Sequence, residues 1–103
     1  MINKIKFICS VEFYDDEILN IEKRSNDITF MMTSNNHTSL LKLEFINVTN
    51  SLNITNYSLL GKIEYKDNSF ILPLENNKLI INASDVVIND MNEDDNKYVK
   101  YLR

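Results

Sequence analysis

Four carboxylates lie close together near the start of the sequence, at Glu12, Asp15, Asp16 and Glu17. Carboxylate oxygens are the ligands that Ca²⁺ prefers, so a cation site is one interpretation of this group. A calcium loop, however, spaces its ligands at alternate positions and bends at a glycine, and this run has neither feature. We therefore favour a solvated turn between two strands. Its carboxylates and the adjacent Tyr14 would contact a protein partner, because tyrosine is enriched at the centres of protein interfaces.

A second acidic group lies near the C-terminal end, at Asp90, Glu93, Asp94 and Asp95. Its plainest interpretation is a solubilising tail, and its functional interpretation is a surface that docks on a basic partner. We carry the functional interpretation forward for both acidic groups. The sequence thus predicts a partner-binding set that consists of Tyr14, Asp15, Asp16, Glu17, Asp90, Glu93, Asp94 and Asp95.

Groups that catalyse reactions or bind metals are sparse. His37 is the only histidine and Cys9 the only cysteine, so the usual zinc ligand sets cannot form. A nucleophilic Cys9–His37 pair would need an exposed, activated thiol, whereas Cys9 falls on the apolar phase of its segment. Gly61 stands alone, which excludes a glycine-rich phosphate-binding loop. We therefore expect no enzyme activity, no metal and no cofactor, with paired carboxylates as the one remaining route to catalysis.

The charge balance indicates which partners the protein takes. The formal net charge is −4, and the basic residues are scattered, with Lys23-Arg24 the only adjacent pair. Phosphate backbones are bound by basic stripes, so we expect no nucleic acid and instead a protein partner with a basic surface. No stretch approaches the length of a membrane span, and no uninterrupted apolar run precedes the first acidic group. We expect no membrane partner and a cytoplasmic location, in a bacterium or in a host cell if the protein is viral. The abundance of Asn, Ile and Lys indicates an AT-rich genome.

Alternating apolar residues at the start of the sequence predict a first strand over residues 4–13. Every second position is apolar, which is the period of a strand with one buried face: Ile5, Phe7, Cys9, Val11 and Phe13. The same phase makes Cys9 a buried, small hydrophobic residue. We expect a turn over 14–16, a second strand over 17–23, a turn over 25–27 and a third strand over 28–33.

The stretch 38–60 is the longest apolar-rich region, and we expect the fold to be organised around it. Leu41, Leu43 and Phe45 alternate with polar residues, which predicts a central strand. A polar turn at 49–51 then leads into a return strand that begins near Leu52. A ligand groove along these strands is the alternative interpretation, but no polar residues converge there.

The remaining segments are short and are separated by turns that depend on Asn and Asp, because the sequence holds only one glycine and one proline. We expect strands over 62–66, 70–74, 79–81 and 86–88, with Pro73 on an edge strand or at the end of a ladder. The prediction is an all-β, single-domain antiparallel sandwich or barrel of about seven to nine short strands over residues 1–89. Residues 90–103 form a tail that is either a short packed helix or a frayed end.

The sequence contains the run Phe13-Tyr14-Asp15-Asp16-Glu17-Ile18-Leu19-Asn20-Ile21, followed by Ile28-Thr29-Phe30 and Phe45-Ile46-Asn47-Val48. Together these segments resemble the opening of small all-β bacterial proteins that include immunity proteins of contact-dependent or polymorphic toxin systems. The resemblance covers about residues 11–60. That group typically has a histidine where this sequence has Tyr14, so no role of that histidine is carried over. The resemblance implies a non-enzymatic protein that binds and neutralises a partner.

The sequence therefore predicts a protein-binding module of the inhibitor or immunity type. Two alternatives stay open. The first is a phage or viral anti-defence inhibitor of a host protein, which would share the small size, acidic charge and lack of catalytic groups. The second is a structural subunit of a larger, virion-like assembly, which would self-associate through an open strand edge.

Overall fold

The computed structural model describes residues 4–34, 38–52 and 58–90. These residues form eight antiparallel strands and one short helix, joined by turns and loops. A five-stranded sheet has the order β4-β1-β2-β3-β8, and a three-stranded sheet has the order β5-β6-β7. The elements are α1 (Lys4–Ser10), β1 (Phe13–Arg24), β2 (Asp27–Ser34), β3 (Ser39–Ile46), β4 (Ser58–Gly61), β5 (Glu64–Lys66), β6 (Ser69–Pro73), β7 (Lys78–Asn82) and β8 (Asp85–Asp90). The predicted all-β antiparallel fold is confirmed.

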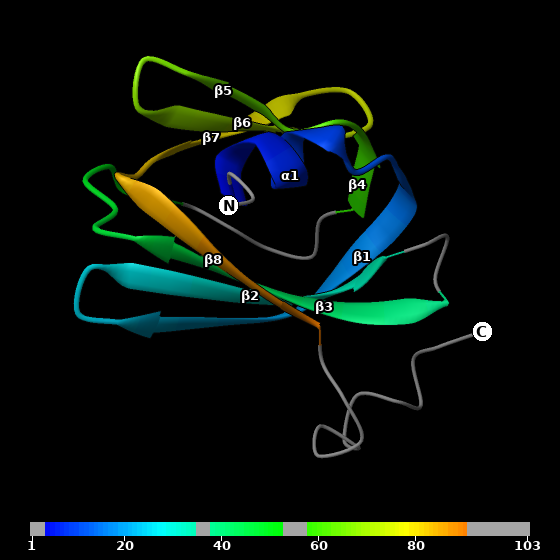
Figure 1. Cartoon of the computed structure of the whole chain (residues 1–103), viewed down its shortest axis with the longest axis horizontal. Coiled ribbons are helices and arrows are strands. Elements are labelled where there is room, and N and C mark those ends of the chain that lie inside the picture. The colour runs from blue at the N-terminus through cyan, green and yellow to red at the C-terminus, as the bar shows by residue number, and fades with distance from the viewer. Residues whose placement is uncertain (1–3, 35–37, 53–57, 91–103) are drawn as a thin grey trace.

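The two sheets face each other across a core in which aromatic rings form a continuous chain (Figure 1). Phe30 on β2 packs against Phe45 on β3, with ring centroids 5.3 Å apart, and Phe45 reaches Phe70 on β6 at 5.2 Å, both edge to face. Tyr65 on β5 extends the chain at 4.7 Å from Phe70. All three phenylalanines are fully buried. This geometry lets a positive ring edge meet a negative ring face, so the contacts add to simple burial.

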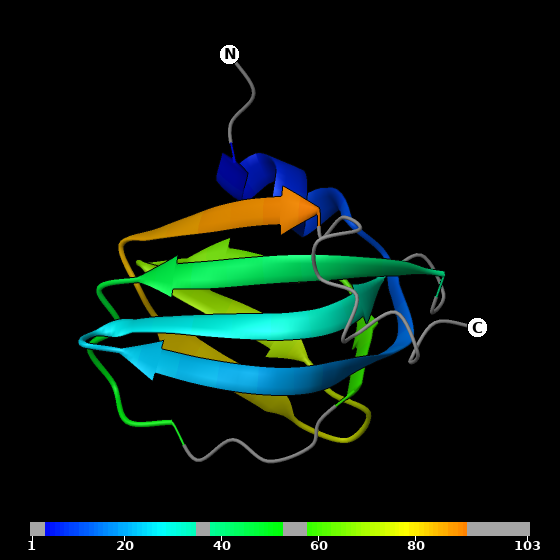
Figure 2. The same cartoon turned by 90° about the horizontal axis from the view of Figure 1, so that it is seen from below.

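The sides of the sandwich are closed by different elements. On one side, β4 pairs with β1 and also forms an isolated bridge from Leu59 to Leu74, just after β6, so it links the two sheets. On the other side, α1 contacts both β8 and β5 and lies along the outer edge of β8 (Figures 1 and 2). The helix thus covers the gap that the two sheets leave open.

The predicted first strand over 4–13 is wrong, because residues 4–10 form α1. Ile5, Ile8 and Cys9 are spaced three and four positions apart, so a helix places them on one face. Ile8 is fully buried, although a strand would have turned it outward, and Phe7 is 46 % exposed, although a strand would have buried it. Ile5 and Cys9 pack beside Ile8 against the core. The segment carries a helical and an alternating pattern at once, and tertiary packing selects the helix.

The predicted turn over 14–16 is also wrong, because the chain continues as one strand from Phe13 to Arg24. The pairing of β1 with β4 shifts register between Tyr14 and Asp16, which marks a β-bulge at Asp15. Asp15 has a φ of 58°, in the left-handed region that aspartate tolerates better than most residues. The acidic residues that predicted a turn therefore form a bulge.

The stretch 38–60 is organised differently from the prediction. The strand through Leu41, Leu43 and Phe45 is confirmed as β3, but its neighbours are β2 and β8. The return strand was expected beside it, and β4 instead pairs with β1. Both edges of β3 are already occupied, so β4 extends the sheet at its far side. Residues 53–57, which include part of the expected return strand, lie outside the described residues.

The other strand predictions hold. The Ser25-Asn26 turn between β1 and β2 and the Asp67-Asn68 turn between β5 and β6 both use left-handed backbone angles without glycine. Pro73 is the last residue of β6, where it ends the ladder. The predicted tail 91–103 lies outside the described residues, and so does His37, while Asp90 ends β8.

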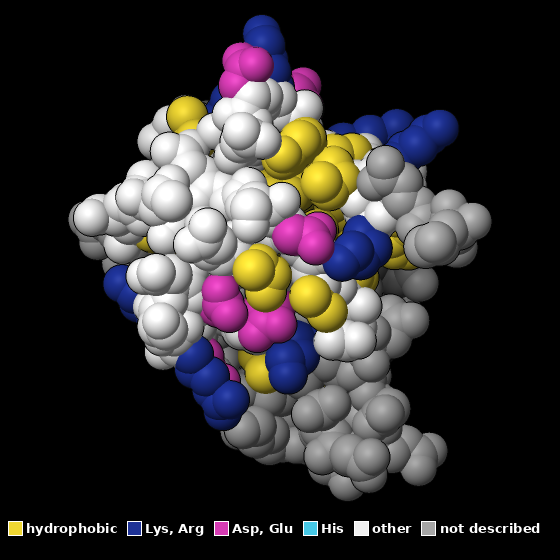
Figure 3. Space-filling model, turned by 60° about the vertical axis from the view of Figure 1, so that its left-hand side comes forward, with side chains coloured by type: hydrophobic (Ala, Val, Ile, Leu, Met, Phe, Trp, Pro, Cys, Tyr) yellow, Lys and Arg dark blue, Asp and Glu magenta, His cyan; other side chains and the backbone are white. Residues whose placement is uncertain are grey.

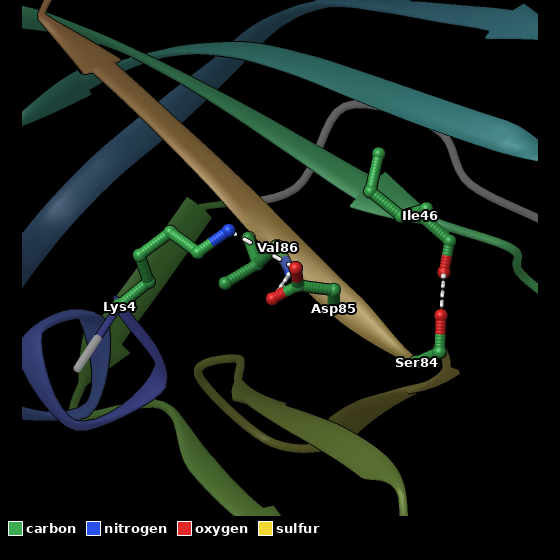
Figure 4. Close-up of polar contacts among 5 residues, drawn as sticks. All are labelled: Lys4, Ile46, Ser84, Asp85 and Val86. Carbon is green, nitrogen blue, oxygen red and sulfur yellow. Dashed lines mark hydrogen bonds and ion pairs between the residues drawn. The ribbon is translucent and has the colours of Figure 1, made fainter.

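An ion pair fastens α1 to β8. Lys4 Nζ lies 3.0 Å from Asp85 Oδ2, and the amide of Val86 donates to Asp85 Oδ1 at 2.8 Å (Figure 4). The hydrogen bond from Lys4, and next the one from Val86, lower the pKa of the Asp85 carboxyl below its usual value. Since the lowered pKa belongs to the folded state, the carboxylate stabilises the fold above the ordinary aspartate pKa, and this stabilisation is lost as the pH falls through the lowered pKa.

Replacing Lys4 with glutamine should raise the pKa of Asp85 toward its ordinary value, which an NMR titration of the side-chain carboxyl carbon measures. Both side chains are about half exposed, so screening limits the loss of stability near neutral pH to under about 1 kcal/mol. That loss should disappear at a pH below the lowered pKa. Lys78→Gln, which removes an exposed lysine on β7, should leave the Asp85 titration unchanged, and an unchanged titration in Lys4→Gln would contradict the ion pair.

The aromatic chain should dominate the stability of the domain. Phe45→Ala should lower the free energy of unfolding by about 3–5 kcal/mol, because it removes the ring that contacts both Phe30 and Phe70 and leaves a cavity. Phe7→Ala makes the same chemical change on an exposed helix position, where a loss of about 0.5 kcal/mol is expected. Urea denaturation measures both values, and similar losses in the two variants would contradict the packing described here.

Candidate protein-contact surface

An exposed apolar pair lies on the outer face of β1 and β4. Tyr14 and Leu60 face each other across the two strands, and their side chains are 55 % and 48 % exposed. Residues directly opposite in an antiparallel pair have neighbouring side chains, so Tyr14 and Leu60 form one patch and not two isolated residues. The sequence prediction included Tyr14 and missed Leu60, because Leu60 follows Leu59 and only the strand pairing shows which leucine faces outward.

The bulge at Asp15 determines which neighbouring side chains are buried and which are exposed. Phe13, Asp16 and Ile18 are buried, whereas Tyr14 and Glu17 are exposed. In a regular strand, Asp16 would lie on the same face as Tyr14, because side chains alternate with a period of two. The extra residue reverses this relation, so Asp16 turns inward while Tyr14 and Glu17 share the outer face.

Buried Asp16 accepts hydrogen bonds from Tyr14 and Thr33, and a third bond links Thr33 to Glu17. Asp16 Oδ2 accepts from the amide of Tyr14 at 3.0 Å, and Asp16 Oδ1 accepts from the Thr33 hydroxyl at 3.1 Å. Thr33 Oγ1 in turn accepts from the amide of Glu17 at 2.9 Å. Asp16 and Thr33 are both almost completely buried. Asp16 was predicted as a contact residue, and the structure corrects this: its side chain is enclosed and fixes the backbone of Tyr14 and Glu17.

Three exposed carboxylates are close to Tyr14 in the sequence, one just before β1 and two on it. Glu12, Asp15 and Glu17 are all exposed, and Lys62, just after β4, is the nearest exposed basic residue along the paired strands. We name the group formed by Tyr14, Leu60, Glu12, Asp15 and Glu17 the contact face. It combines an exposed aromatic and an exposed aliphatic side chain with local negative charge.

The second acidic group is not brought to the contact face by the described part of the chain. Asp90 pairs with Leu41 at the end of β8, and its side chain is not described. The strands β2 and β3 lie between β8 and β1, a distance of about 14 Å at ordinary strand spacing. Glu93, Asp94 and Asp95 lie outside the described residues. A role for these four residues remains a prediction.

Cys9 has the environment expected of a packed thiol. It is half-buried against the core, and burial, with a smaller contribution from the Glu64 carboxylate, raises the pKa of its thiol. A raised pKa disfavours the thiolate, which is the reactive form. Among residues 4–34, 38–52 and 58–90, no group of three or more His, Cys, Asp or Glu side chains is placed to hold a metal ion.

A polar pocket that the sequence did not indicate lies at the end of the sandwich where three connections meet. Its volume is about 440 Å³. Figure 3 brings this end forward and shows a broad region with few charged or hydrophobic side chains. We name it the amide pocket, and its lining consists of Asn47, Thr49, Asp67, Asn68, Ser69, Asn82, Ala83 and Ser84. Asn47, Asp67 and Asn68 have left-handed backbone angles. Asp67 and Asn68 follow the strand predicted over 62–66 and were interpreted only as turn formers, whereas Asn47 entered the sequence analysis only as part of the run Phe45-Ile46-Asn47-Val48.

Comparisons with protein families, curated proteins and solved structures give no match to the chain. Within the described residues, no helix has both the length and the apolar character that crossing a membrane requires.

The same substitution should destabilise the protein at Asp16 and have little effect at the adjacent Asp15. Asp16→Asn replaces an acceptor oxygen with a donor amide in a buried site that receives two donated hydrogen bonds, so it should lower the free energy of unfolding by about 1–3 kcal/mol. Asp15→Asn should change it by less than about 0.5 kcal/mol, because asparagine also tolerates the left-handed angle and the side chain is solvated. Chemical denaturation of both variants measures the difference, and equal effects would refute the buried position of Asp16.

Proposed function

We propose that this protein is a non-enzymatic binding module whose contact face docks on a protein partner with a basic surface. The observation that carries the proposal is the Tyr14–Leu60 pair, exposed on the outer face and flanked by Glu12, Asp15 and Glu17. Large apolar side chains that neighbour each other on a surface lose unfavourable hydration when a partner covers them. The exposed carboxylates supply attraction for lysine and arginine side chains at the rim of such an interface.

The rigidity of the contact face supports the same function. The amides of Tyr14 and Glu17 are tied to Asp16 and Thr33, so the backbone that presents the patch is fixed before a partner arrives. A preformed surface loses less conformational entropy on binding than a mobile loop does. The buried Asp16 network therefore favours a surface that recognises a partner of defined shape.

An inhibitor or immunity-type protein is the class that we put first. The resemblance to small bacterial immunity proteins begins at Phe13 and Tyr14, and so includes the strand that forms the contact face. A phage or viral inhibitor of a host defence protein would use the same kind of surface, and it is the second candidate. In either case we propose a cytoplasmic site of action and no nucleic-acid or membrane partner.

The third candidate is a subunit that assembles through strand edges, and the edge of β7 supports it less well. On β7, the side-chain amide of Asn50 donates to the carbonyl of Ile80 and accepts from the amide of Asn82, both at 2.9 Å. The amide of Thr49 also donates to the carbonyl of Asn82 at 2.9 Å. These bonds occupy backbone groups that another strand would need. The edge of β7 is thus blocked over half its length.

The binding proposal is tested by affinity capture from the native host with the immobilised protein and two double variants. Asp15→Asn with Glu17→Gln removes charge from the contact face and should slow association with the captured protein and weaken its salt dependence. Tyr14→Ala with Leu60→Ala should weaken binding by about tenfold or more, because truncating central interface residues commonly costs more than 1 kcal/mol.

Matched variants control for charge and for apolar area. Glu22→Gln with Glu75→Gln removes the same charge from exposed positions elsewhere, and Ile80→Ala removes an exposed apolar side chain from the other sheet. Both should retain the partner. If a partner binds the wild type and both contact-face variants equally well while their circular-dichroism spectra match, the contact face is not the binding site.

A further inference from the structure

The amide pocket lies at the opposite end of the sandwich from β4. In Figure 1 the β5–β6 and β7–β8 connections lie at the left of the molecule, and β4 lies at the right. Three segments form its walls: the chain after β3 at Asn47 and Thr49, the β5–β6 turn at Asp67 and Asn68, and the β7–β8 connection at Ser84. Loops at the end of a β-sandwich are common binding sites, since the sheets hold them without constraining their side chains.

Backbone hydrogen bonds join these three segments in pairs. Thr49 N donates to the carbonyl of Asn82 at 2.9 Å, and Ala83 N donates to the carbonyl of Asn68 at 3.2 Å. Ser84 donates to the carbonyl of Ile46 twice, from its amide at 3.0 Å and from its hydroxyl at 3.3 Å (Figure 4). The walls are therefore fixed relative to one another, and a ligand does not have to order them on binding.

Two lining asparagines have their carboxamide groups oriented by neighbours. Asn82 Oδ1 accepts from the Ser69 hydroxyl at 2.6 Å, and Asn68 Oδ1 accepts from the Tyr65 hydroxyl at 3.0 Å. A carboxamide whose oxygen is engaged still offers two N–H donors on its nitrogen. Within the described residues, neither Nδ2 group has a hydrogen-bond partner, so both amides remain available to a ligand in the pocket that they line.

The types of the lining residues indicate which class of ligand the pocket can bind. The described lining residues include no Lys, Arg or His, so a phosphate or sulfate would lack a counter-charge from them. Among the same residues, Asp67 is the only carboxylate, which is too little negative charge for a divalent cation. Ala83 is the only apolar side chain of this described lining, so a hydrophobic ligand would gain little by burial against it. What remains is a neutral ligand with many hydrogen-bonding groups.

We propose that the amide pocket binds a neutral, hydroxyl-rich ligand of the size of a mono- or disaccharide. A sugar hydroxyl both donates and accepts, so it can accept from the Nδ2 groups of Asn68 and Asn82 and donate to the Asp67 carboxylate. The Thr49 hydroxyl supplies either role. The volume of about 440 Å³ lies in the range of small-molecule sites. This binding activity is independent of the contact face and of the partner proposed for it.

The proposal is tested by NMR on the full, ¹⁵N-labelled chain titrated with a panel of methyl glycosides and disaccharides at millimolar concentration. At least one sugar should shift the backbone amide signals of the pocket segments, at residues 47–49, 67–69 and 82–84, in a saturable manner. Inorganic phosphate and Ca²⁺, titrated separately, should leave those signals in place. Saturable binding of phosphate or Ca²⁺ at the pocket, or no saturable shift from any sugar in the panel, overturns the proposal.

One substitution and its matched control assign the effect to the pocket. Asn82→Asp keeps an oxygen that accepts from Ser69 but replaces the free NH₂ donor with a carboxylate oxygen, so sugar affinity should fall by about tenfold or more. Asn76→Asp makes the same change at an exposed position between β6 and β7 and should leave the affinity unchanged. Should Asn82→Asp unfold the protein, Asn68→Ala provides the second test by removing a donor from an exposed turn residue. Full affinity in a folded Asn82→Asp or Asn68→Ala variant refutes the assigned donors.

Discussion

The contact between Phe45 and Phe70 is the interaction on which the rest of the structure depends. It is the edge-to-face contact that crosses from the five-stranded sheet to the three-stranded sheet. A three-stranded sheet with strands of three to five residues has little stability alone and needs a second layer to cover its apolar face. The aromatic chain supplies that layer and ends at Tyr65, whose hydroxyl bonds to Asn68 in the wall of the amide pocket. Core packing and the geometry of a surface site therefore share one set of residues.

A buried carboxylate in so small a domain requires a physical reason. Moving an ionised or polar group out of water costs free energy unless hydrogen bonds replace its hydration. Asp16 recovers part of that cost from Tyr14 and Thr33, and all described buried side-chain nitrogen and oxygen atoms have hydrogen-bond partners. An apolar residue at this position would leave the amide of Tyr14 without its acceptor. The bulge turns the Asp16 side chain inward, where its carboxylate accepts from the amide of Tyr14 and fixes the backbone that presents the exposed Tyr14 side chain.

Much of the fold could be predicted from alternation and turn chemistry, and the errors have specific causes. The strands through Phe30, through Leu43 and Phe45, and through Phe70 carry long, regular alternation, and their positions are correct. The first segment was predicted wrongly because Ile5, Phe7 and Cys9 fit a strand while Ile5, Ile8 and Cys9 fit a helix, and seven residues are too few for periodicity to decide. Strand order failed for β4, since pairing between Tyr14 and Leu60 depends on contacts across the whole chain.

The candidate site shows the same limit at the level of single residues. Asp15 and Asp16 are identical and adjacent, so no rule based on residue type separates them, yet one is exposed and the other is fully buried. The one-residue bulge at Asp15 determines which of the two is buried, and it sets the phase of the side chains as far as Ile18, where the register of β1 against β2 shifts again. The sequence indicated acidic residues near Tyr14, and three of them, Glu12, Asp15 and Glu17, are exposed. The register that divides these residues between surface and interior is a property of the paired strands and becomes visible only in three dimensions.

Few polar side chains are buried in the described part of the chain. Three polar residues are buried, Asp16, Thr29 and Thr33, and two of them serve the hydrogen bonds that fix the bulge. The other buried side chains in the described part of the chain are apolar. Such an interior contributes rigidity. A rigid scaffold with an exposed apolar pair at one end and oriented amides at the other is suited to recognition, because both surfaces exist before a ligand or partner arrives.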